Sequence, residues 1–316
     1  MAQTLESLTR QMGSMESIHS VVRTMKTLSV INSAPYEQAG RAIEAYYQTV
    51  LDGLHAFLKA SGPLDFKAQV VGAWVVVVFG SDHGLCGNYN EILAAHVASG
   101  LGSDDGLQPI VLCVGAQMAD ALADRSIEVE KVFLPPASVD GIGRLANRVT
   151  QYLDDVRNRT RASEIAVNLA FTARSDSGGQ IARTVALLPL GTGVLNELER
   201  KPWRSRSLPG FSMPADTLFP ALIRGFVFAS LFKASAEAMV TENAARLALM
   251  SQAEQSVEDR LEALRSDANA LRQSGITTEL LDVIIGFEAL KNSARRKPGA
   301  KENKLDPAPG RDDRKT

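Results

Sequence analysis

Cysteine is scarce in this sequence, because Cys86 and Cys113 are the only two among 316 residues and form no C-x-x-C pair. Two isolated cysteines provide neither a disulfide framework nor the paired thiolates of a structural zinc site. The four histidines are also scattered along the chain. We therefore expect a reducing compartment, no metal site and no bound cofactor.

An excess of charge of one sign is also missing, since 34 Lys and Arg face 36 Asp and Glu. The formal net charge of −2 argues against nucleic acid as a partner. The longest apolar run, residues 70–79, is half of the ~20 residues that a membrane-crossing helix requires. The first residues lack the basic and apolar regions of a signal peptide. We expect no direct membrane span and a bacterial cytosolic location.

Glycine and proline are absent from residues 226–274, which predicts a helix far longer than the average of about 11 residues. Gly275 is expected to end it. Apolar residues recur along it in steps of three and four, as in a coiled-coil seam. The seam residues are Val240, Ala244, Leu247, Met250, Ala253, Val257, Leu261, Leu264, Ala268 and Leu271.

A second long helix is predicted near the start of the chain, continuing to about Lys59 with Pro35 as a kink or a restart. A long helix with one narrow apolar stripe needs a partner of similar length. We expect the two terminal helices to wind around each other antiparallel. The first helix has its own seam of Leu5, Leu8, Met12, Met15, Ile18, Val22, Met25 and Leu28.

Short apolar and β-branched runs between these helices alternate with helical stretches, which is typical of an α/β unit. The predicted strands are 70–79, 109–115, 165–171 and 181–188, and the predicted helices are 89–99, 117–124 and 142–157. The fold class is thus α/β, a Rossmann-like domain inserted into an antiparallel coiled coil.

Four segments follow from this interpretation. They are an N-terminal shaft helix at 1–60, an α/β foot domain at 61–220, a C-terminal shaft helix at 221–290 and a disordered basic tail at 291–316. The tail carries nine Lys or Arg against four Asp or Glu and almost no apolar residues.

The turn at residues 80–87 follows the strongest strand and precedes a helix, where α/β folds often bind ligands. An enzyme with its site at this turn is therefore one alternative. The turn has no Lys at the position that a phosphate loop requires. Ser81, Asp82 and His83 are adjacent in sequence, whereas a catalytic triad converges from separated positions. Cys86 has no partnered histidine and is expected to be structural.

Carboxylates on the long C-terminal helix could suggest a metal site, but no His at i+3 accompanies them. We expect Glu242, Glu254, Glu258 and Glu262 to form a solvated face. A generic coiled-coil adaptor is the other alternative function.

Several separated stretches resemble the gamma subunits of F-type rotary ATP synthases. Residues 276–286, I-T-T-E-L-L-D-V-I-I-G, are similar to the family signature I-T-x-E-x-x-[DE]-x-x-x-G. Residues 81–87, S-D-H-G-L-C-G, resemble the family turn T-D-[RK]-G-L-C-G. Residues 241–246, T-E-N-A-A-R, resemble S-E-x-A-A-R, and 23–26, R-T-M-K, resemble K-A-M-[EK].

The resemblance implies a central rotor stalk that couples H⁺ or Na⁺ flow through a membrane ring to ATP synthesis or hydrolysis. It implies that the chain performs no bond chemistry itself. The implied partners are the alpha and beta subunits of the catalytic hexamer, the epsilon subunit and the ring of c subunits. The implied location is peripheral, on the cytoplasmic face of the bacterial inner membrane.

The resemblance also implies which residues meet the partners and which shape the turn. The implied partner contacts are Arg23, Met25, Lys26, Arg246, Arg272, Gln273, Ile276, Thr277, Glu279, Asp282 and Gly286. The implied structural turn consists of Asp82, Gly84, Leu85, Cys86 and Gly87.

The chain departs from the family in two places. Residues 28–35 contain no Lys or Arg where the family has a basic run, and Phe287 replaces the usual Ala. These departures suggest a divergent subfamily, for which the alternative, N-ATPase-like bacterial enzyme is a candidate.

Overall fold

The computed structural model describes residues 4–61, 71–101, 108–161, 164–175, 179–190, 197–198, 200–203, 206–207 and 210–295. The chain divides into two compact units. The smaller unit joins Met1–Ser17 to Glu258–Thr316, and the larger unit is Ile18–Val257. Helices α1 (Leu5–Ser61) and α6 (Ala215–Arg295) each contribute to both.

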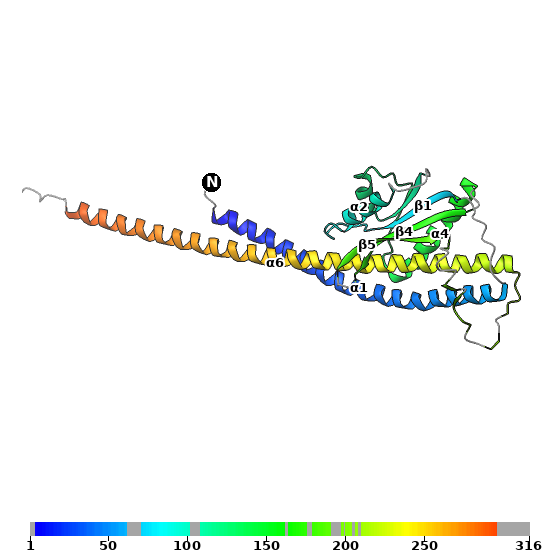
Figure 1. Cartoon of the computed structure of the whole chain (residues 1–316). Helices are drawn as coiled ribbons and strands as arrows, with labels where there is room; N and C mark the ends of the chain where they lie inside the picture. Colours follow the sequence, from blue (N-terminus) through cyan, green and yellow to red (C-terminus); the bar gives the residue numbers. More distant parts are fainter. Residues whose placement is uncertain are drawn as a thin grey trace, which may run out of the picture. The chain divides into compact units, whose positions relative to one another are not determined.

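The larger unit is built around a five-stranded sheet in the order β3-β2-β1-β4-β5, of which β1, β4 and β5 are labelled in Figure 1. All neighbours pair in parallel except β4 and β5, which are antiparallel. The strands are β1 (Val71–Phe79), β2 (Pro109–Val114), β3 (Lys131–Phe133), β4 (Glu164–Arg174) and β5 (Gln180–Leu188). The shorter helices are α2 (Tyr89–Leu101), α3 (Ala116–Ala123) and α4 (Val139–Thr160).

The central strand β1 is buried on both faces, as its continuous β-branched run predicts. Its register aligns Val76 with Val111 of β2 and with Asn168 of β4. Helices α2 and α3 cover one face, where Val76 and Val78 pack with Leu93 and Met118. The expected α/β order is confirmed, with each predicted strand and helix found within a few residues.

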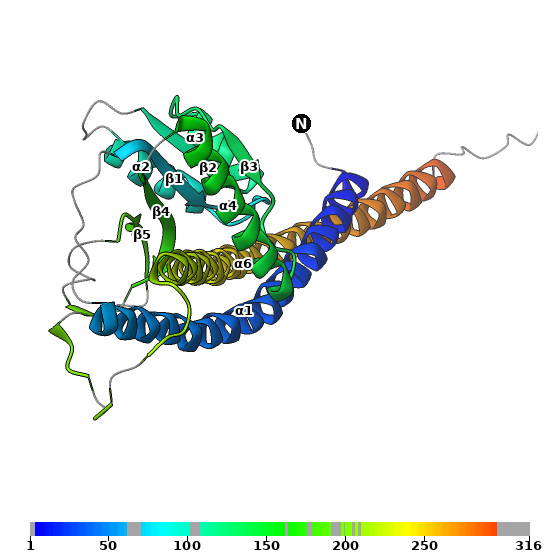
Figure 2. The same cartoon turned by 90° about the vertical axis from the view of Figure 1, so that its right-hand side faces the viewer.

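The other face is covered by α4 together with α1 and α6, which lie side by side below the sheet in Figure 2. Buried residues of α4 recur at helical spacing and pack on the strands. Leu54 of α1 and Leu231 of α6 join the same core. The domain is therefore packed directly onto the two long helices.

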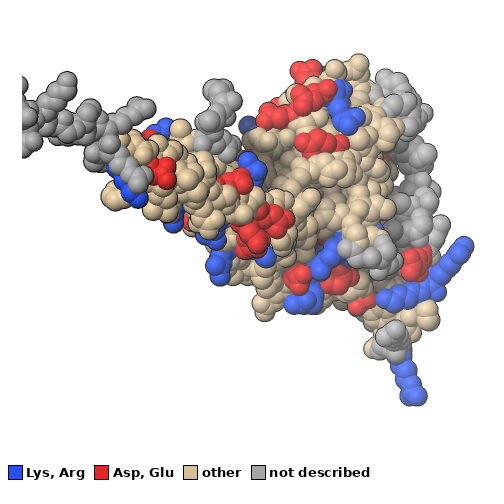
Figure 3. Space-filling view, turned by 90° about the vertical axis from the view of Figure 1, so that its left-hand side faces the viewer, with Lys and Arg blue, Asp and Glu red and all other residues tan. Residues whose placement is uncertain are grey.

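Within the larger unit α1 and α6 run antiparallel, as predicted. Lys233 binds Glu44 at 2.6 Å, and Lys26 binds Glu254 at 2.6 Å. From the first pair to the second, the residue number falls on α1 and rises on α6, so the two helices run antiparallel. On the face drawn in Figure 3, small groups of acidic and basic side chains lie among uncharged ones, in keeping with the near-neutral net charge.

The smaller unit pairs the first turns of α1 with the C-terminal part of α6. Leu8, Leu264 and Ala268 are buried against one another, with Met12 and Met15 packed beside them. Arg265 and Glu16 approach to 3.4 Å, but both are more than half exposed. Exposed pairs contribute little, so apolar packing holds this unit together.

The two long helices differ from the predictions at several places, and α6 already begins at Ala215 instead of residue 221. α6 continues through Gly275 to Arg295, because one glycine costs only about 1 kcal/mol in a helix of good formers. α1 likewise contains Pro35 without a break. Residues 291–295 are helical and not disordered, while residues 296–316 of the predicted tail lie outside the described residues. The three-residue strand β3 was not predicted.

The predicted seam of α1 is wrong in its middle. Leu8, Met15, Val22, Ser29 and Tyr36 mark the stripe that faces inward, in steps of seven residues. Ile18 and Leu28 lie off this stripe and are exposed. On α6, Ala244 and Leu271 are exposed, whereas Met250, Leu261, Leu264 and Ala268 are buried as predicted.

By length and composition, α6 between Ala215 and Asn292 contains a segment apolar enough to cross a membrane. The core helix of a soluble protein can have the same composition. Phe226, Val227 and Leu231 of α6 are buried in the core of the larger unit. The absence of a direct membrane span stays a prediction.

Candidate functional site

The turn after β1 lies at the carboxyl end of the central strand. From this strand the chain continues to β2 on one side, and it later returns from β3 to β4 on the other side. Such a switch point is where open α/β sheets bind ligands. Gly80 donates its N–H to the Val114 carbonyl at 3.0 Å, which ties the turn to β2. Leu85 and Gly87 both adopt positive φ, +64° and +66°. The turn is therefore tightly specified by its backbone.

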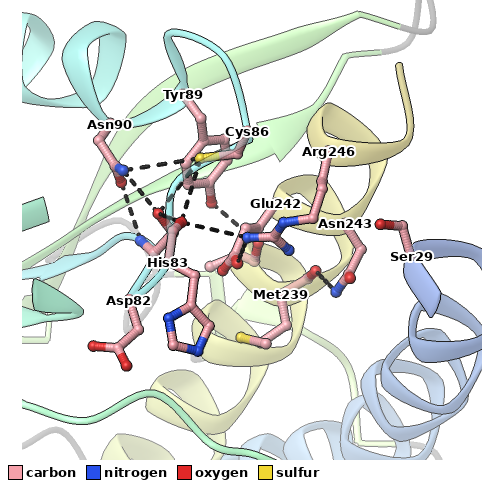
Figure 4. A network of polar contacts seen from close by, with 12 residues as sticks. Ser29, Asp82, His83, Cys86, Tyr89, Asn90, Met239, Glu242, Asn243 and Arg246 are labelled. Atoms are coloured by element: carbon pink, nitrogen blue, oxygen red, sulfur yellow. Dashed lines mark hydrogen bonds and ion pairs between the residues drawn. The ribbon is translucent and has the colours of Figure 1, made fainter. Parts of the chain in front are cut away.

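Ser81 and Asn90 hold the interior of the turn (Figure 4). The Ser81 N–H donates to Asn90 Oδ1 at 3.0 Å, and Asn90 Nδ2 donates to Ser81 Oγ at 2.7 Å. Ser81 Oγ in turn donates to the His83 carbonyl at 3.0 Å. Both side chains are buried, so this network fixes the loop from within.

The side chains of the turn point apart or are engaged in structural contacts. The His83 ring points away from Cys86 in Figure 4. Asp82 accepts the Ala116 N–H at 3.1 Å and so caps α3 instead of orienting a base. Burial raises the pKa of the Cys86 thiol, which disfavours the reactive thiolate. Among the described residues of the turn, no nucleophile is hydrogen-bonded to a histidine ring.

Helix α6 meets the turn through a buried ion pair. Arg246 binds Glu242 at 2.6 Å, with side chains that are only 12% and 7% exposed. The same guanidinium donates to the His83 carbonyl at 3.5 Å. Glu242 thus does not belong to the solvated face that the sequence predicted. The prediction considered the helix alone, whereas the turn of another element covers this part of α6.

A second buried link joins α2, α6 and β4. Tyr89 donates its hydroxyl to the Ala238 carbonyl at 3.0 Å and lies 3.4 Å from Thr241 Oγ1. Thr241 Oγ1 also lies 2.8 Å from the Thr172 carbonyl of β4. Burial raises the pKa of Tyr89, so its hydroxyl remains a donor. We call the two links, made by Glu242, Arg246, Tyr89 and Thr241, the polar joint.

The predicted contact residues on α1 lie in the larger unit. Arg23 is exposed and Met25 is half-buried. Lys26 turns toward α6, and its hydrogen bond holds the pKa of the Glu254 carboxyl below its usual value. Arg246, predicted as a partner contact, is instead engaged within the chain by Glu242 and His83.

The remaining predicted contacts lie in the smaller unit, all on α6 and all exposed. They are Arg272, Gln273, Ile276, Thr277, Glu279, Asp282 and Gly286. Large apolar side chains lie among and beside them and are exposed as well, with Val283 at 69% and Phe287 at 71%. An apolar surface of this kind indicates an interface with another molecule.

Sequence reasoning missed Tyr89, Asn90 and the burial of Glu242. A usable signal was present, since Tyr89 and Asn90 follow the turn directly and Glu242 precedes Arg246 by one helical turn. That spacing permits an ion pair on one face of a helix. It does not reveal that another element covers the pair.

We expect Tyr89→Phe to destabilise the larger unit by about 1 kcal/mol, because a buried hydroxyl loses its hydrogen bonds. The Ala238 carbonyl keeps a contact at 3.0 Å from Thr241 Oγ1, which limits the cost. Urea unfolding measures the change. Tyr46→Phe is the control, because Tyr46 is 46% exposed and should shift stability by less than about 0.5 kcal/mol. Equal shifts would contradict a role for the Tyr89 hydroxyl.

We expect Glu242→Gln to alter the pH dependence of stability. Burial is the main cause that raises the pKa of Glu242, and Arg246 opposes it. The folded state therefore retains this proton above the ordinary pKa of 4.5, and stability falls as pH rises through the folded pKa. Glu242→Gln should remove that fall, so its stability relative to the native chain should improve from pH 4.5 upward. The assignment would be contradicted if the free energy of unfolding, measured with urea, changed with pH in the same way for the variant and the native chain across this range.

Comparison with known proteins identifies the family. The family model described as ATP synthase matches residues 4–290. The ATP synthase gamma chain of Mycolicibacterium smegmatis is 26% identical, over 93% of this chain and 100% of the relative. The gamma chain of Lachnoclostridium phytofermentans is 24% identical, over 91% and 99% respectively.

Solved structures agree with this fold. A chain of the Euglena gracilis mitochondrial ATP synthase, in a structure of its OSCP/F1/c-ring part, superposes with a TM-score of 0.61 at 17% identity. The superposition covers 95% of this chain and 98% of that one. A chain from the rotor of the same enzyme gives a TM-score of 0.57 at 14% identity. The chain belongs to the ATP synthase gamma chain family.

Proposed function

We propose that this chain is the central rotor stalk of a rotary ATP synthase and carries rotation between a membrane ring and a catalytic hexamer. The observation that supports this most directly is the match of residues 4–290 to the family, together with the antiparallel helices α1 and α6. In this proposal the alpha and beta subunits surround the paired helices. The epsilon subunit and the ring of c subunits bind the foot, residues 61–220.

The chain acts mechanically in this proposal and breaks no bond itself. The arrangement of Ser81, His83 and Cys86 supports this, because it offers no activated nucleophile. The polar joint would carry load, because it ties the turn of the α/β domain to α6 by buried, charge-assisted bonds. The complex would lie peripherally on the cytoplasmic face of a bacterial inner membrane.

Co-expression with the other subunits of its own complex, the membrane ring included, tests the proposal. We expect a complex whose ATP hydrolysis drives ion pumping in inverted membrane vesicles only when this chain is present. The control is the same preparation without the chain. Hydrolysis and pumping that are indifferent to the chain would refute the rotor function.

A further inference from the structure

A groove on the larger unit runs between three of its helices, α1, α4 and α6. It consists of two adjoining hollows, of about 600 Å³ and about 400 Å³, that share Tyr46 and Phe228. The rings of these two residues meet edge to face, with centroids 6.4 Å apart. Both volumes fall in the range of small-molecule sites. We call the two hollows together the three-helix groove.

The three-helix groove changes from polar to apolar along its length. On α6, residues from Ala221 to Phe228 line the larger, polar hollow, and Phe228 and Phe232 line the smaller, apolar one. On α4, residues 147–154 line the polar hollow and Val139 lines the apolar one. At a rise of 1.5 Å per residue, the stretch from Ala221 to Phe232 is about 16 Å long. The groove is therefore linear, with one polar and one apolar end.

The apolar end lies between α1 and α6. Ala42 and Ile43 of α1 line one side of it, and Phe228 and Phe232 of α6 line the other. Every described residue that lines this end is apolar, apart from the hydroxyl of Tyr46. A hydrocarbon chain laid along this end would remove apolar surface from water on both sides, which is favourable.

The polar end carries an excess of positive charge. Asp154 of α4 pairs with Arg224 of α6 and, at 3.7 Å, with Arg157 of its own helix. One carboxylate thus serves two guanidinium groups, which leaves one positive charge without a counter-charge in this cluster. The Arg224 side chain lines the groove and is 68% exposed. Its planar guanidinium has more N–H donors than one carboxylate uses, so it can bind a second one.

Neutral hydrogen-bonding groups lie in the same hollow as Arg224. The Tyr46 hydroxyl is close to Gly225, where an added Cβ would come within 3.4 Å of it. Asn147 and Gln151 of α4 line the hollow as well. Within the described part of the chain these three side chains have no hydrogen-bond partner, so their O–H and N–H groups are available to an anion.

We propose that the three-helix groove binds a straight-chain amphipathic carboxylate, such as a free fatty acid. Its carboxylate binds Arg224, and its hydrocarbon chain lies along Ile43 and Phe232. Charge selects this class, because an ammonium head group would meet the excess positive charge and an alcohol would form no ion pair. The occupant touches three helices at once and so braces the α/β domain against α1 and α6. The inference goes beyond the rotor function and does not depend on it.

Calorimetric titration of the full chain with decanoate, below the concentration at which decanoate forms micelles, tests the proposal. We expect saturable binding of one decanoate per chain, at least about tenfold tighter than that of 1-decanol. Decyltrimethylammonium should bind no better than 1-decanol. Decanoate should also raise the thermal unfolding temperature in a concentration-dependent manner, because it binds the folded state.

Two variants with matched controls locate the ligand. Arg224→Gln should reduce the affinity for decanoate to about that for 1-decanol, whereas Arg41→Gln should leave it within about twofold. Ala42→Phe fills the apolar end and should weaken decanoate binding about tenfold, whereas Ala45→Phe should not. Arg41 and Ala45 lie on α1 outside the groove lining. All four sites are exposed, so unfolding without ligand should be unchanged.

Three outcomes would overturn the inference while leaving the rotor function intact. The first is the lack of saturable decanoate binding below the micellar concentration. The second is equal weakening by Arg224→Gln and Arg41→Gln, which would place the ligand elsewhere. The third is binding to phosphatidylglycerol vesicles that Arg224→Gln abolishes and decanoate does not compete with, because the occupant would then be a lipid head group. Failure of the chain to support pumping would refute the proposed function and would leave decanoate binding unaffected.

Discussion

Gly115→Ala is expected to destabilise the larger unit by about 3 kcal/mol. Gly115 precedes α3 with φ of +106°, a conformation that residues with a side chain rarely adopt. An added Cβ would lie 2.4 Å from the Ser81 carbonyl oxygen, so backbone strain and a steric clash add together. The clash falls on the turn that holds Arg246. Urea unfolding should show the loss, and ATP-driven pumping should fall with it.

Gly84→Ala is the matched control for Gly115→Ala. Gly84 lies in the same turn region, but a Cβ added there would meet no atom within 4 Å, and its φ is not in the left-handed range. We expect a change of less than about 0.5 kcal/mol. If the two variants unfold at the same urea concentration, the close packing of Gly115 on Ser81 is not what stabilises the turn.

The sequence predicted those elements whose pattern is local. The run of β-branched residues in β1 predicts a strand, and the alternation of such runs with helical stretches predicts an α/β sheet. The long interval without Gly or Pro likewise marks α6. These features depend on each segment's own composition, so they can be recognised without knowing what packs against them.

The features that could not be predicted depend on contacts between distant segments. Glu242 is buried because the turn at His83 covers it, and no pattern within α6 reports that. The spacing of Ile18 and Leu28 fits a coiled-coil seam as well as that of Val22 does. Packing against other elements decides which of them is buried, and the buried stripe follows steps of seven residues that include Val22. β3 was missed because three residues are too few for a recognisable alternation.

The turn of the candidate site was recognised from its own residues, whereas its contacts with α3 and α6 were not foreseen. Asp82 and Cys86 were expected to be structural, and their contacts with Ala116 and Ser81 agree with that expectation. Arg246 was expected at a partner surface, yet it pairs with Glu242 inside the fold. A charged residue in a motif can contact another subunit or form an ion pair within its own chain, and only its burial in the structure distinguishes these two roles.

Leu264→Gly is expected to have the largest effect in the smaller unit, about 3 to 6 kcal/mol. Leu264 is 2% exposed and packs with Leu8 and Ala268. Loss of a buried leucine costs about 2–5 kcal/mol, and glycine inside a helix adds about 1 kcal/mol. Because few other apolar residues are buried in the described part of this unit, the first turns of α1 should detach from α6. Amide hydrogen exchange of residues 5–17 should lose its protection.

Two controls separate packing from helix propensity and from general damage. Ala263→Gly lies next to Leu264 on the exposed side of α6, so it should cost only the propensity term of about 1 kcal/mol. Cys86→Ser changes a buried residue of the larger unit with little change of volume and should leave exchange at residues 5–17 unaltered. We expect ATP-driven pumping to fall most in Leu264→Gly, because torque on a helix pair is carried by the side chains packed between the helices. Equal pumping by Leu264→Gly and Cys86→Ser would mean that the apolar contact of Leu8 with Leu264 carries no load during rotation.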